Sequence, residues 1–257
     1  MGLSGPLMEI LEFWKLYKNG VENEVKGWFY DHDLIMFWLI DFIQKEAEWS
    51  GNRCELGVYQ GKSAIALGTM AGADEWLFCF DAFQEVPEQT VAANIQRFCP
   101  DLRDRLVCVQ QDLMALRTPP SDVCPNSLRF LHLDAVHDHP SVLNDLRNFL
   151  PLLTSEAVIV LDDCFDPDWP GVATAMTEFC LSDIGRHIRP FAASRSKMYL
   201  CARPYVEIYQ RCIVASGYIE NLSLERVLDV SVLRCYTNFP VPQEELLRVL
   251  CAGDATR

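Results

Sequence analysis

The chain has 257 residues, of which 50% are apolar, and a formal net charge of −14 at pH 7. This length and apolar content fit one sizeable globular domain. The acidic balance argues against a nucleic-acid or anionic-membrane partner, because phosphate groups are repelled by an acidic surface. No basic segment followed by an apolar one opens the chain, and the apolar run at 34–40 is too short to span a bilayer.

The cysteines indicate the compartment. Eleven are spread along the chain without a C-x-x-C pair, and several stand in apolar runs, where cysteine behaves as a small hydrophobe. The absence of zinc spacing and the odd total argue against a metal knuckle or a complete disulfide framework. We therefore expect a reduced, cytoplasmic protein.

The predicted elements alternate between helix and strand. Residues 6–49 read as helical, with Asp31 or Asp33 as the N-cap of a helix over 34–45. Strand-like runs follow at 53–57, 76–81, 106–110, 128–134 and 157–162. Helical stretches are expected at 63–71, 89–98, 141–150 and 172–181. Two last strand-like runs, 187–192 and 197–202, are joined by a link short enough only for an antiparallel hairpin.

This order predicts an α/β, Rossmann-like fold with a mostly parallel, seven-stranded sheet that ends in an antiparallel hairpin. We expect an N-terminal helical cap at 1–50, a ligand-binding core at 51–203, and a C-terminal extension of the same domain at 204–257. The N-terminal helices are rich in large apolar side chains, which predicts either a lid over the site or a homo-oligomer interface. These side chains are Trp14, Trp28, Phe29, Phe37 and Trp38.

A glycine loop follows the first strand-like run. Glu55 ends the run, Gly57 and Gly61 bracket a turn, and a helix follows from Ser63. Such a corner turns backbone N–H groups toward a ligand, although an ordinary strand–helix turn has the same appearance. The spacing is not the G-x-G-x-x-G of dinucleotide sites, and Glu55 would repel a diphosphate. A cationic ligand without phosphate fits better, and S-adenosylmethionine meets that description; Tyr59 is expected to line its methionine part.

Acidic residues stand at the ends of five successive strand-like runs, where open α/β sheets bind ligands. Each acid alone reads more simply as a helix cap or a solvated loop residue. Chance alone, however, does not readily place five acids along one edge of a sheet. Glu55 is expected at the amino-acid end of the cofactor, Asp81 at the ribose hydroxyls and Asp112 at the adenine amine. Asp134 is a further expected cofactor contact, together with Gly57, Tyr59, Gly61 and Ser63.

Four segments resemble the motifs of the macrocin O-methyltransferase-type, S-adenosylmethionine-dependent enzymes. They are CELGVYQGKSAIAL, LFCFDAF, LHLDAVHDHPSVLNDL and VIVLDDCFDPDWPGVATAM, and the resemblance covers about residues 53 to 202. It implies a class I methyltransferase fold and methylation of a hydroxyl on a sugar or another natural product. It also implies Mg²⁺ ligands at Asp134, Asp162 and Asp163.

The residues support that metal set independently, because neighbouring strand tips lie about 5 Å apart and hard oxygen ligands suit Mg²⁺. The alternative is that Asp162 or Asp163 only caps a turn. The related sugar methyltransferases carry an aspartate base two residues after the first metal-binding Asp, and the matching position here is Val136. Valine cannot accept a proton, so the adjacent His137 is the candidate catalytic base, with His139 second.

The sequence therefore predicts an O-methyltransferase that acts on a hydroxylated small molecule, with S-adenosylmethionine and Mg²⁺ as cofactors. Two other classes stay open. A non-catalytic adenosyl-binding protein of the same fold would explain Val136, and a nicotinamide-dependent oxidoreductase would use a similar strand–helix corner. Trp169 either walls the acceptor site or packs on the sheet edge.

Overall fold

The computed structural model describes residues 10, 12–219 and 221–236. The strands are β1 (Asn52–Leu56), β2 (Leu77–Asp81), β3 (Leu106–Gln110), β4 (Leu128–Leu133), β5 (Leu153–Leu161), β6 (Ile188–Ala193), β7 (Met198–Ala202), β8 (Asn221–Val227) and β9 (Val230–Tyr236). The α-helices are α2 (Glu22–Glu24), α3 (Asp31–Glu46), α4 (Lys62–Thr69), α5 (Glu88–Phe98), α6 (His139–Phe149), α7 (Pro170–Leu181) and α8 (Val206–Ser216). Short turns of 3-10 or π-helix lie at Tyr17–Val21 (η1), Pro100–Leu102 (η2), Leu113–Ala115 (η3), Leu150–Leu152 (η4) and Arg203–Tyr205 (η5).

In the described part of the chain, the strands form a nine-stranded sheet in the order β3-β2-β1-β4-β5-β7-β6-β9-β8. Strands β1 to β5 run parallel to one another, and β7 runs antiparallel to both β5 and β6. The predicted Rossmann-like α/β fold with its closing hairpin is confirmed. The sheet is wider than the seven predicted strands, because β8 and β9 form a second hairpin that joins the edge of β6.

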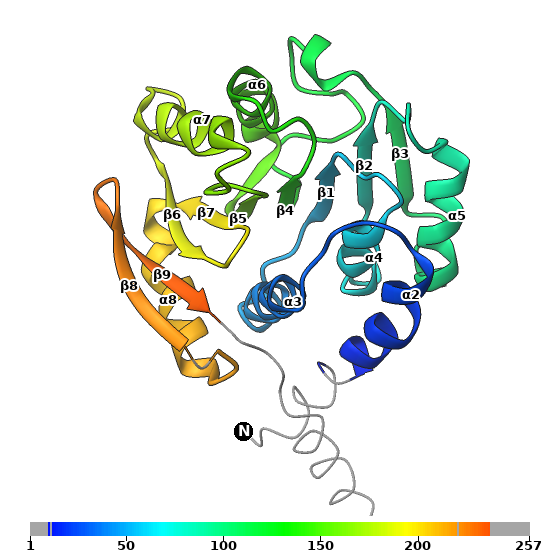
Figure 1. Cartoon of the computed structure of the whole chain (residues 1–257), viewed down its shortest axis with the longest axis horizontal. Helices are drawn as coiled ribbons and strands as arrows, with labels where there is room; N and C mark the ends of the chain where they lie inside the picture. The colour runs from blue at the N-terminus through cyan, green and yellow to red at the C-terminus, as the bar shows by residue number, and fades with distance from the viewer. Residues whose placement is uncertain (1–9, 11, 220, 237–257) are drawn as a thin grey trace, which may run out of the picture.

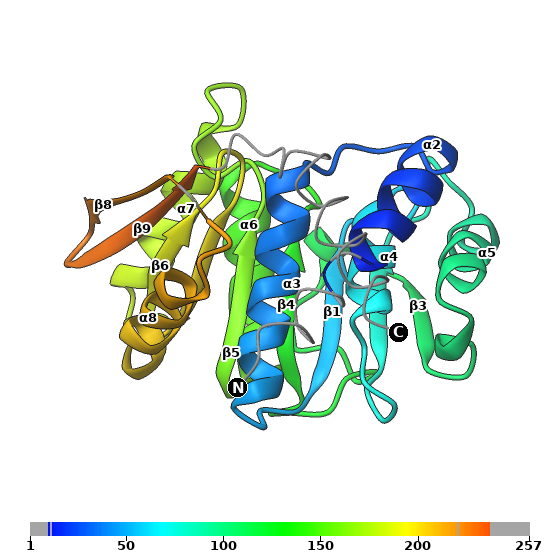
Figure 2. The same cartoon turned by 90° about the horizontal axis from the view of Figure 1, so that it is seen from below.

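Helices cover both faces of the sheet. Figures 1 and 2 show α3, α4 and α8 on one face and α6 and α7 on the other. All six residues of β4 are buried, as expected for a parallel strand covered on both sides. The strand order reverses between β1 and β4, which opens a crevice at their carboxyl ends.

Helix α3 differs from its predicted start. It begins at Asp31, Tyr30 occupies the N-cap, and no side chain caps it, so the prediction of an Asp31 or Asp33 cap is wrong. Asp33 is instead fully buried and accepts hydrogen bonds from the hydroxyls of Ser194 (2.6 Å) and Ser196 (2.8 Å). Both serines lie on the link between β6 and β7, which is distant from Asp33 in the sequence. Because the carboxylate of Asp33 binds these hydroxyls, it does not cap the helix.

The apolar surplus of the N-terminal helices is mostly buried within the chain itself. Phe29, Phe37 and Trp38 belong to the core between α3 and the sheet, whereas Trp28 is 78% exposed. The surface that motivated the oligomer prediction is therefore smaller than the sequence suggests. Residues 1–9 of the predicted helical cap and 237–257 of the predicted extension lie outside the described residues.

A buried ionic network lies at the amino end of the sheet. The guanidinium groups of Arg53 and Arg129 are fully buried, and both pair with the carboxylates of Asp41 and Glu75. Gln44 on α3 adds a hydrogen bond to Arg129. The network joins α3 to the amino ends of β1 and β4. It therefore supports the two strands whose carboxyl ends carry the candidate site.

Two smaller findings concern the helices and the cysteines. None of the helices formed by the described residues is both long enough and apolar enough to cross a membrane. The cysteines that the structure describes are free thiols, most of them buried, and Cys251 lies outside the described residues.

Candidate active site

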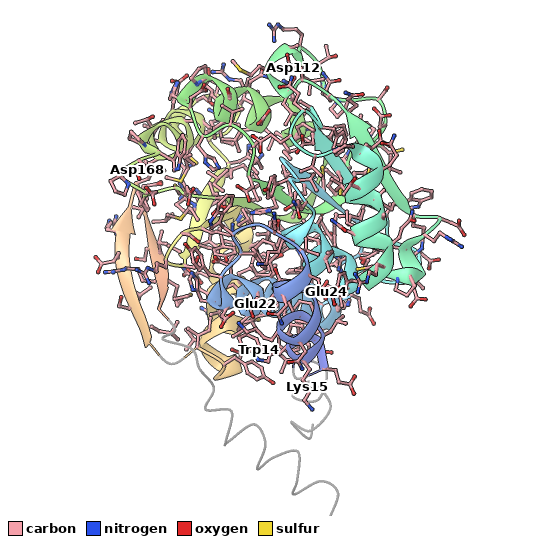
Figure 3. All side chains as sticks on the ribbon, turned by 45° about the vertical axis from the view of Figure 1, so that its right-hand side comes forward. Trp14, Lys15, Glu22, Glu24, Asp112 and Asp168 are labelled. Carbon is pink, nitrogen blue, oxygen red and sulfur yellow. The ribbon has the colours of Figure 1, made fainter. Side chains whose placement is uncertain are left out.

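A pocket of about 1080 Å³ opens over the carboxyl ends of β1, β2, β4 and β5. Its wall includes the link 26–30 between α2 and α3, which Figure 2 shows at this end of the sheet. Figure 3 labels Asp112 and Asp168, two lining residues that lie far apart on the rim. Ten lining residues are acidic and three are lysines, so the pocket is strongly electronegative and suits a cationic ligand.

Gly57 is required by a close approach. Its φ is 78°, and a Cβ at this position would lie 2.2 Å from the carbonyl oxygen of Asp134. No other residue type fits there, so the glycine loop can pass directly over the end of β4. Gly57, Tyr59 and Ser63 line the pocket as predicted for cofactor contacts, whereas Gly61 precedes α4 and is not part of the lining.

Asp81, the predicted ribose ligand, also holds the glycine loop. Its Oδ2 accepts hydrogen bonds from the backbone N–H groups of Val58 (2.7 Å) and Tyr59 (3.3 Å). Its Oδ1 accepts one from the N–H of Phe83 (2.7 Å). A carboxylate offers about four acceptor positions, so capacity for a ligand hydroxyl is left.

Asp112, the predicted adenine ligand, lies on the exposed rim after β3. Its Oδ1 accepts a hydrogen bond from the N–H of Met114 (3.0 Å) and so caps the short turn η3. Two residues of α6 that the sequence reasoning missed line the same pocket. Ser141 Oγ and Asp145 Oδ1 are buried without a hydrogen-bond partner among the described residues, and burial raises the pKa of Asp145 to about 7.

Glu55 lies beneath the pocket and does not line it. Its Oε1 is 2.7 Å from His132 Nδ1, and Oε2 has no partner among the described residues. Burial raises the pKa of Glu55 well above its ordinary value, while the hydroxyl of Ser63 opposes that shift. Glu55 therefore does not face the pocket itself, and its expected role at the amino-acid end of the cofactor, directly or through water, stays a prediction.

The predicted metal acids lie close together, but a lysine lies among them. Asp134 and Asp162 have carboxylate oxygens within 4.8 Å of each other and of a His132 ring nitrogen. The buried Lys197 places its Nζ 2.7 Å from Asp162 Oδ1 and 3.1 Å from His132 Nε2. Burial and the charge of Asp162 raise the pKa of Asp134 to about 7. Burial acts to raise the pKa of Asp162 too, but Lys197 lowers it to about 2.

These contacts do not fit the predicted Mg²⁺ site. Magnesium needs octahedral room around carboxylate oxygens, and here an ammonium group already occupies the buried side of the Asp162 carboxylate. A divalent ion held by Asp134, Asp162 and Asp163 would stand close to that positive charge. The sequence reasoning missed Lys197, although a lysine that opens the apolar strand Met198–Ala202 was a visible signal.

His137, the predicted base, lies between two carboxylates at the pocket wall. Its Nε2 is 3.4 Å from Asp134 Oδ1, and its Nδ1 is 3.6 Å from Asp163 Oδ2. Burial acts to lower the pKa of His137, but the adjacent carboxylate of Asp134, with the charges of Asp162 and Asp163, raises it above its ordinary value. The imidazole therefore has a higher proton affinity than a free histidine.

The surroundings of His137 set its position. The ring of Trp169 packs edge-on against it, with centroids 5.2 Å apart, and Trp169 lines the pocket. At Gly171 a Cβ would lie 2.7 Å from the carbonyl oxygen of His137, so only glycine lets α7 begin so close to this loop. Val136 lines the pocket and is 46% exposed, whereas His139 pairs with Glu178 (3.0 Å) outside the pocket lining.

The link between α2 and α3 is tied to the glycine loop. Lys62 Nζ donates a hydrogen bond to the carbonyl of Gly27 (3.1 Å), and the N–H of Lys26 donates one to Gln60 Oε1 (3.1 Å). The rings of Trp28 and Tyr59 stack with centroids 6.1 Å apart. Lys62 therefore holds this link and is not simply solvated, and the N-terminal segment forms one wall of the pocket.

Comparison with known proteins agrees with this geometry. Residues 54–164 match a protein family described as a methyltransferase domain. No curated protein sequence matches the chain. Among solved structures, the O-methyltransferase NovP has a TM-score of 0.57 at 16% identity, covering 66% of this chain and 79% of its own.

Two further structures share the fold. Cofactor-bound Rv0187 from MTB has a TM-score of 0.52 at 16% identity, covering 76% of this chain and 89% of its own. The calicheamicin methyltransferase CalS11 has a TM-score of 0.50 at 15% identity, with the same two coverages. At such identities the likeness is one of fold. The domain match and the fold together support an S-adenosylmethionine-dependent methyltransferase; the narrower macrocin-type resemblance stays a prediction.

Proposed function

We propose that this methyltransferase transfers a methyl group from S-adenosylmethionine to a hydroxyl of a small molecule, with His137 as the base. The observation that carries the proposal is the position of His137. It lies at the pocket wall between Asp134 and Asp163, over the strand tips where a cofactor of this class binds. A hydroxyl must lose its proton during transfer, and a positioned base such as His137 can remove it.

The cofactor would lie across the strand tips. The electronegative wall would complement the sulfonium and ammonium groups, and Asp81 would offer its remaining acceptor position to a ribose hydroxyl. Asp112 stands one strand further out, where it could accept from the adenine amine. Ser141 Oγ and Asp145 Oδ1 on α6, buried without a hydrogen-bond partner in the described part of the chain, would supply additional polar contacts on this side.

The transfer is an in-line displacement at the methyl carbon. The acceptor oxygen forms a bond to that carbon as the sulfur–carbon bond breaks, its electron pair stays on sulfur, and S-adenosylhomocysteine results. The hydroxyl proton passes to a neutral His137, and the neighbouring carboxylates stabilise the imidazolium that forms. Alignment of the two reactants can supply about 7–11 kcal/mol of the barrier, and a positioned base typically adds about 10²–10⁴-fold.

The chemistry of the pocket narrows the acceptor class. The acidic lining disfavours a phosphorylated or otherwise anionic acceptor, because like charges repel in a cleft of low dielectric. Trp28 and Trp169, both exposed and both in the lining, offer aromatic faces at the mouth. A neutral or cationic hydroxylated molecule, either aromatic or with an apolar sugar face, fits this wall best.

The implied Mg²⁺ is not part of the proposal. Asp134, Asp162 and Asp163 form an acid cluster, and Lys197 contacts Asp162 on its buried side. No step of the transfer is therefore assigned to a metal. The proposal is tested by calorimetry with S-adenosylhomocysteine, followed by assay of methyl transfer to a panel of hydroxylated acceptors. Binding of S-adenosylhomocysteine in preference to NADH supports it, and a preference for NADH would overturn it.

A further inference from the structure

Lys197 has an environment that few lysines have. Its side chain is 2% exposed, and its Nζ contacts Asp162 Oδ1 at 2.7 Å and His132 Nε2 at 3.1 Å. It also lies 5.5 Å from the centroid of the Phe29 ring, a distance suited to a cation–π contact. An ion pair with the Asp162 carboxylate holds the ammonium group in this buried position.

The charged lysine also fixes the tautomer of the neighbouring His132. An ammonium group can only donate, so His132 Nε2 must accept, and the ring proton then lies on Nδ1. That Nδ1–H donates to Glu55 Oε1 at 2.7 Å. One hydrogen-bonded chain therefore runs from Glu55 under the glycine loop to Asp162 at the pocket.

The fold builds a dedicated support for this lysine. The β6–β7 link ends at Lys197, and the buried carboxylate of Asp33 on α3 accepts hydrogen bonds from Ser194 and Ser196 in that link. The Oγ of Ser194 accepts a hydrogen bond from the N–H of Lys197 at 3.1 Å, and the N–H of Ser194 donates to the carbonyl of Lys197 at 2.9 Å. Helix α3 thus clamps the link so that the side chain enters the acid cluster.

We propose that Lys197 is a built-in cation that takes the place of a divalent metal beside Asp134 and Asp162. It holds the Asp162 carboxylate in one orientation and compensates its charge, so Asp134 stays free to face His137. A divalent ion would have to share these carboxylates with a fixed ammonium, and the two positive charges repel. The part of this inference that concerns the reaction rests on the proposed function: methyl transfer proceeds without a divalent metal.

The test uses Mn²⁺ alone as the probe, because its binding can be measured without knowledge of the acceptor. Paramagnetic resonance or calorimetry of the full chain compares wild type with Lys197→Met, which keeps the length of the side chain and removes the charge. A third variant, Lys197→Met with Asp162→Asn, removes the carboxylate as well. Lys62→Met is the matched control, because Lys62 lines the same pocket but donates to a backbone carbonyl.

Wild type and Lys62→Met should show no saturable Mn²⁺ binding below about millimolar concentration, the weak end of protein carboxylate sites. Lys197→Met should bind Mn²⁺ at least about tenfold more tightly, since it leaves the acid cluster uncompensated, and the double variant should lose that gain. Tight Mn²⁺ binding by wild type that Asp162→Asn abolishes would overturn the inference. So would a folded Lys197→Met protein that binds no better than wild type.

Two further measurements keep the inference falsifiable. If Lys197→Met does not fold, Lys197→Arg keeps the charge and should keep both the fold and the absence of Mn²⁺ binding; a gain of binding in this variant would contradict the role of charge. Calorimetry with S-adenosylhomocysteine is made on the same samples. A chain that binds neither S-adenosylhomocysteine nor Mn²⁺ refutes the proposed function and leaves the internal cation supported.

Discussion

The Oδ2 of Asp81 accepts a 2.7 Å hydrogen bond from the backbone N–H of Val58. An acid at the end of β2 therefore fixes the loop that leaves β1, and the proposed cofactor site places the ribose at the same acid. Its loss should affect both the loop and the ligand.

Asp81→Asn should weaken the binding of S-adenosylhomocysteine. Asp81 is half-buried, and loss of a charged acceptor of this kind typically costs about 1–3 kcal/mol, which corresponds to roughly 5- to 150-fold in Kd. Titration calorimetry on the purified variant measures this, and Asp104→Asn, on an exposed turn outside the pocket, is the control. Equal affinity of wild type and Asp81→Asn would remove Asp81 from the cofactor site.

The second prediction concerns the pH dependence of His137. A base must be neutral to accept a proton, and Asp134 and its neighbouring acids raise the pKa of His137 above the ordinary value of about 6.5. The rate of methyl transfer should therefore rise with pH and level off only above that ordinary value. The imidazole can also be titrated by NMR without an acceptor, and His137→Gln identifies its signal.

Asp163→Asn should lower the pKa of His137, because one of the carboxylates that stabilise the imidazolium is lost. The rising limb of the rate profile should then move to lower pH. His137→Gln should reduce the rate by about 10²-fold or more while cofactor affinity stays within a few-fold of wild type. A full rate in His137→Gln would show that another group removes the proton.

The third prediction concerns the charge of the acceptor. Matched pairs of hydroxylated compounds that differ only by a phosphate should be methylated unequally, with the phosphorylated member at least about tenfold slower at low salt. The difference should shrink as the ionic strength rises, because salt screens exposed charges. A preference for the phosphorylated member at all salt concentrations would refute the assignment of a neutral or cationic acceptor.

The fourth prediction concerns stability. Glu75→Gln leaves the buried guanidinium groups of Arg53 and Arg129 short of a carboxylate, which should cost about 3–5 kcal/mol of unfolding free energy in denaturant titrations. The control is Glu46→Gln at the exposed end of α3, which should change stability little. A change below about 0.5 kcal/mol in Glu75→Gln would show that the network adds nothing.

The same residue predicts a loss of stability in acid. Burial acts to raise the pKa of Glu75, but Arg129 and Arg53 lower it from 4.5 to about 2. A carboxylate with a depressed folded-state pKa contributes its full stability above 4.5 and loses it as pH falls toward 2. Glu75→Gln should therefore lose stability less steeply than wild type over that range.

Strands β1 to β5 could be predicted because they are short, largely apolar runs with an acid at or just beyond the end. In β2, for example, four apolar residues precede Asp81. The hairpin β8–β9 was missed although its signal was present. Leu222, Leu224 and Val227 are separated by polar residues, and only Leu228 and Asp229 link the two strands.

The sequence could predict that the members of the acid cluster lie together, but not which group pairs with them. The sequence places Asp134 and Asp162 at strand tips, yet the partner of Asp162 is Lys197, which comes from a hairpin link that Asp33 holds in place. Contacts between residues so distant in the chain leave no local pattern. The burial of Glu55 was hidden for the same reason, because its partner His132 lies on the adjacent strand β4.

The central claim is methyl transfer from S-adenosylmethionine to a hydroxyl, and mass spectrometry of a reaction with isotopically labelled S-adenosylmethionine tests it most directly. The protein is incubated with neutral hydroxylated acceptors in excess EDTA. We predict an O-methylated product, with one S-adenosylhomocysteine formed per methyl group, and loss of that product in His137→Gln. Binding of the cofactor without a methylated product from any hydroxylated acceptor, with or without Mg²⁺, would contradict the account and favour a non-catalytic adenosyl-binding protein.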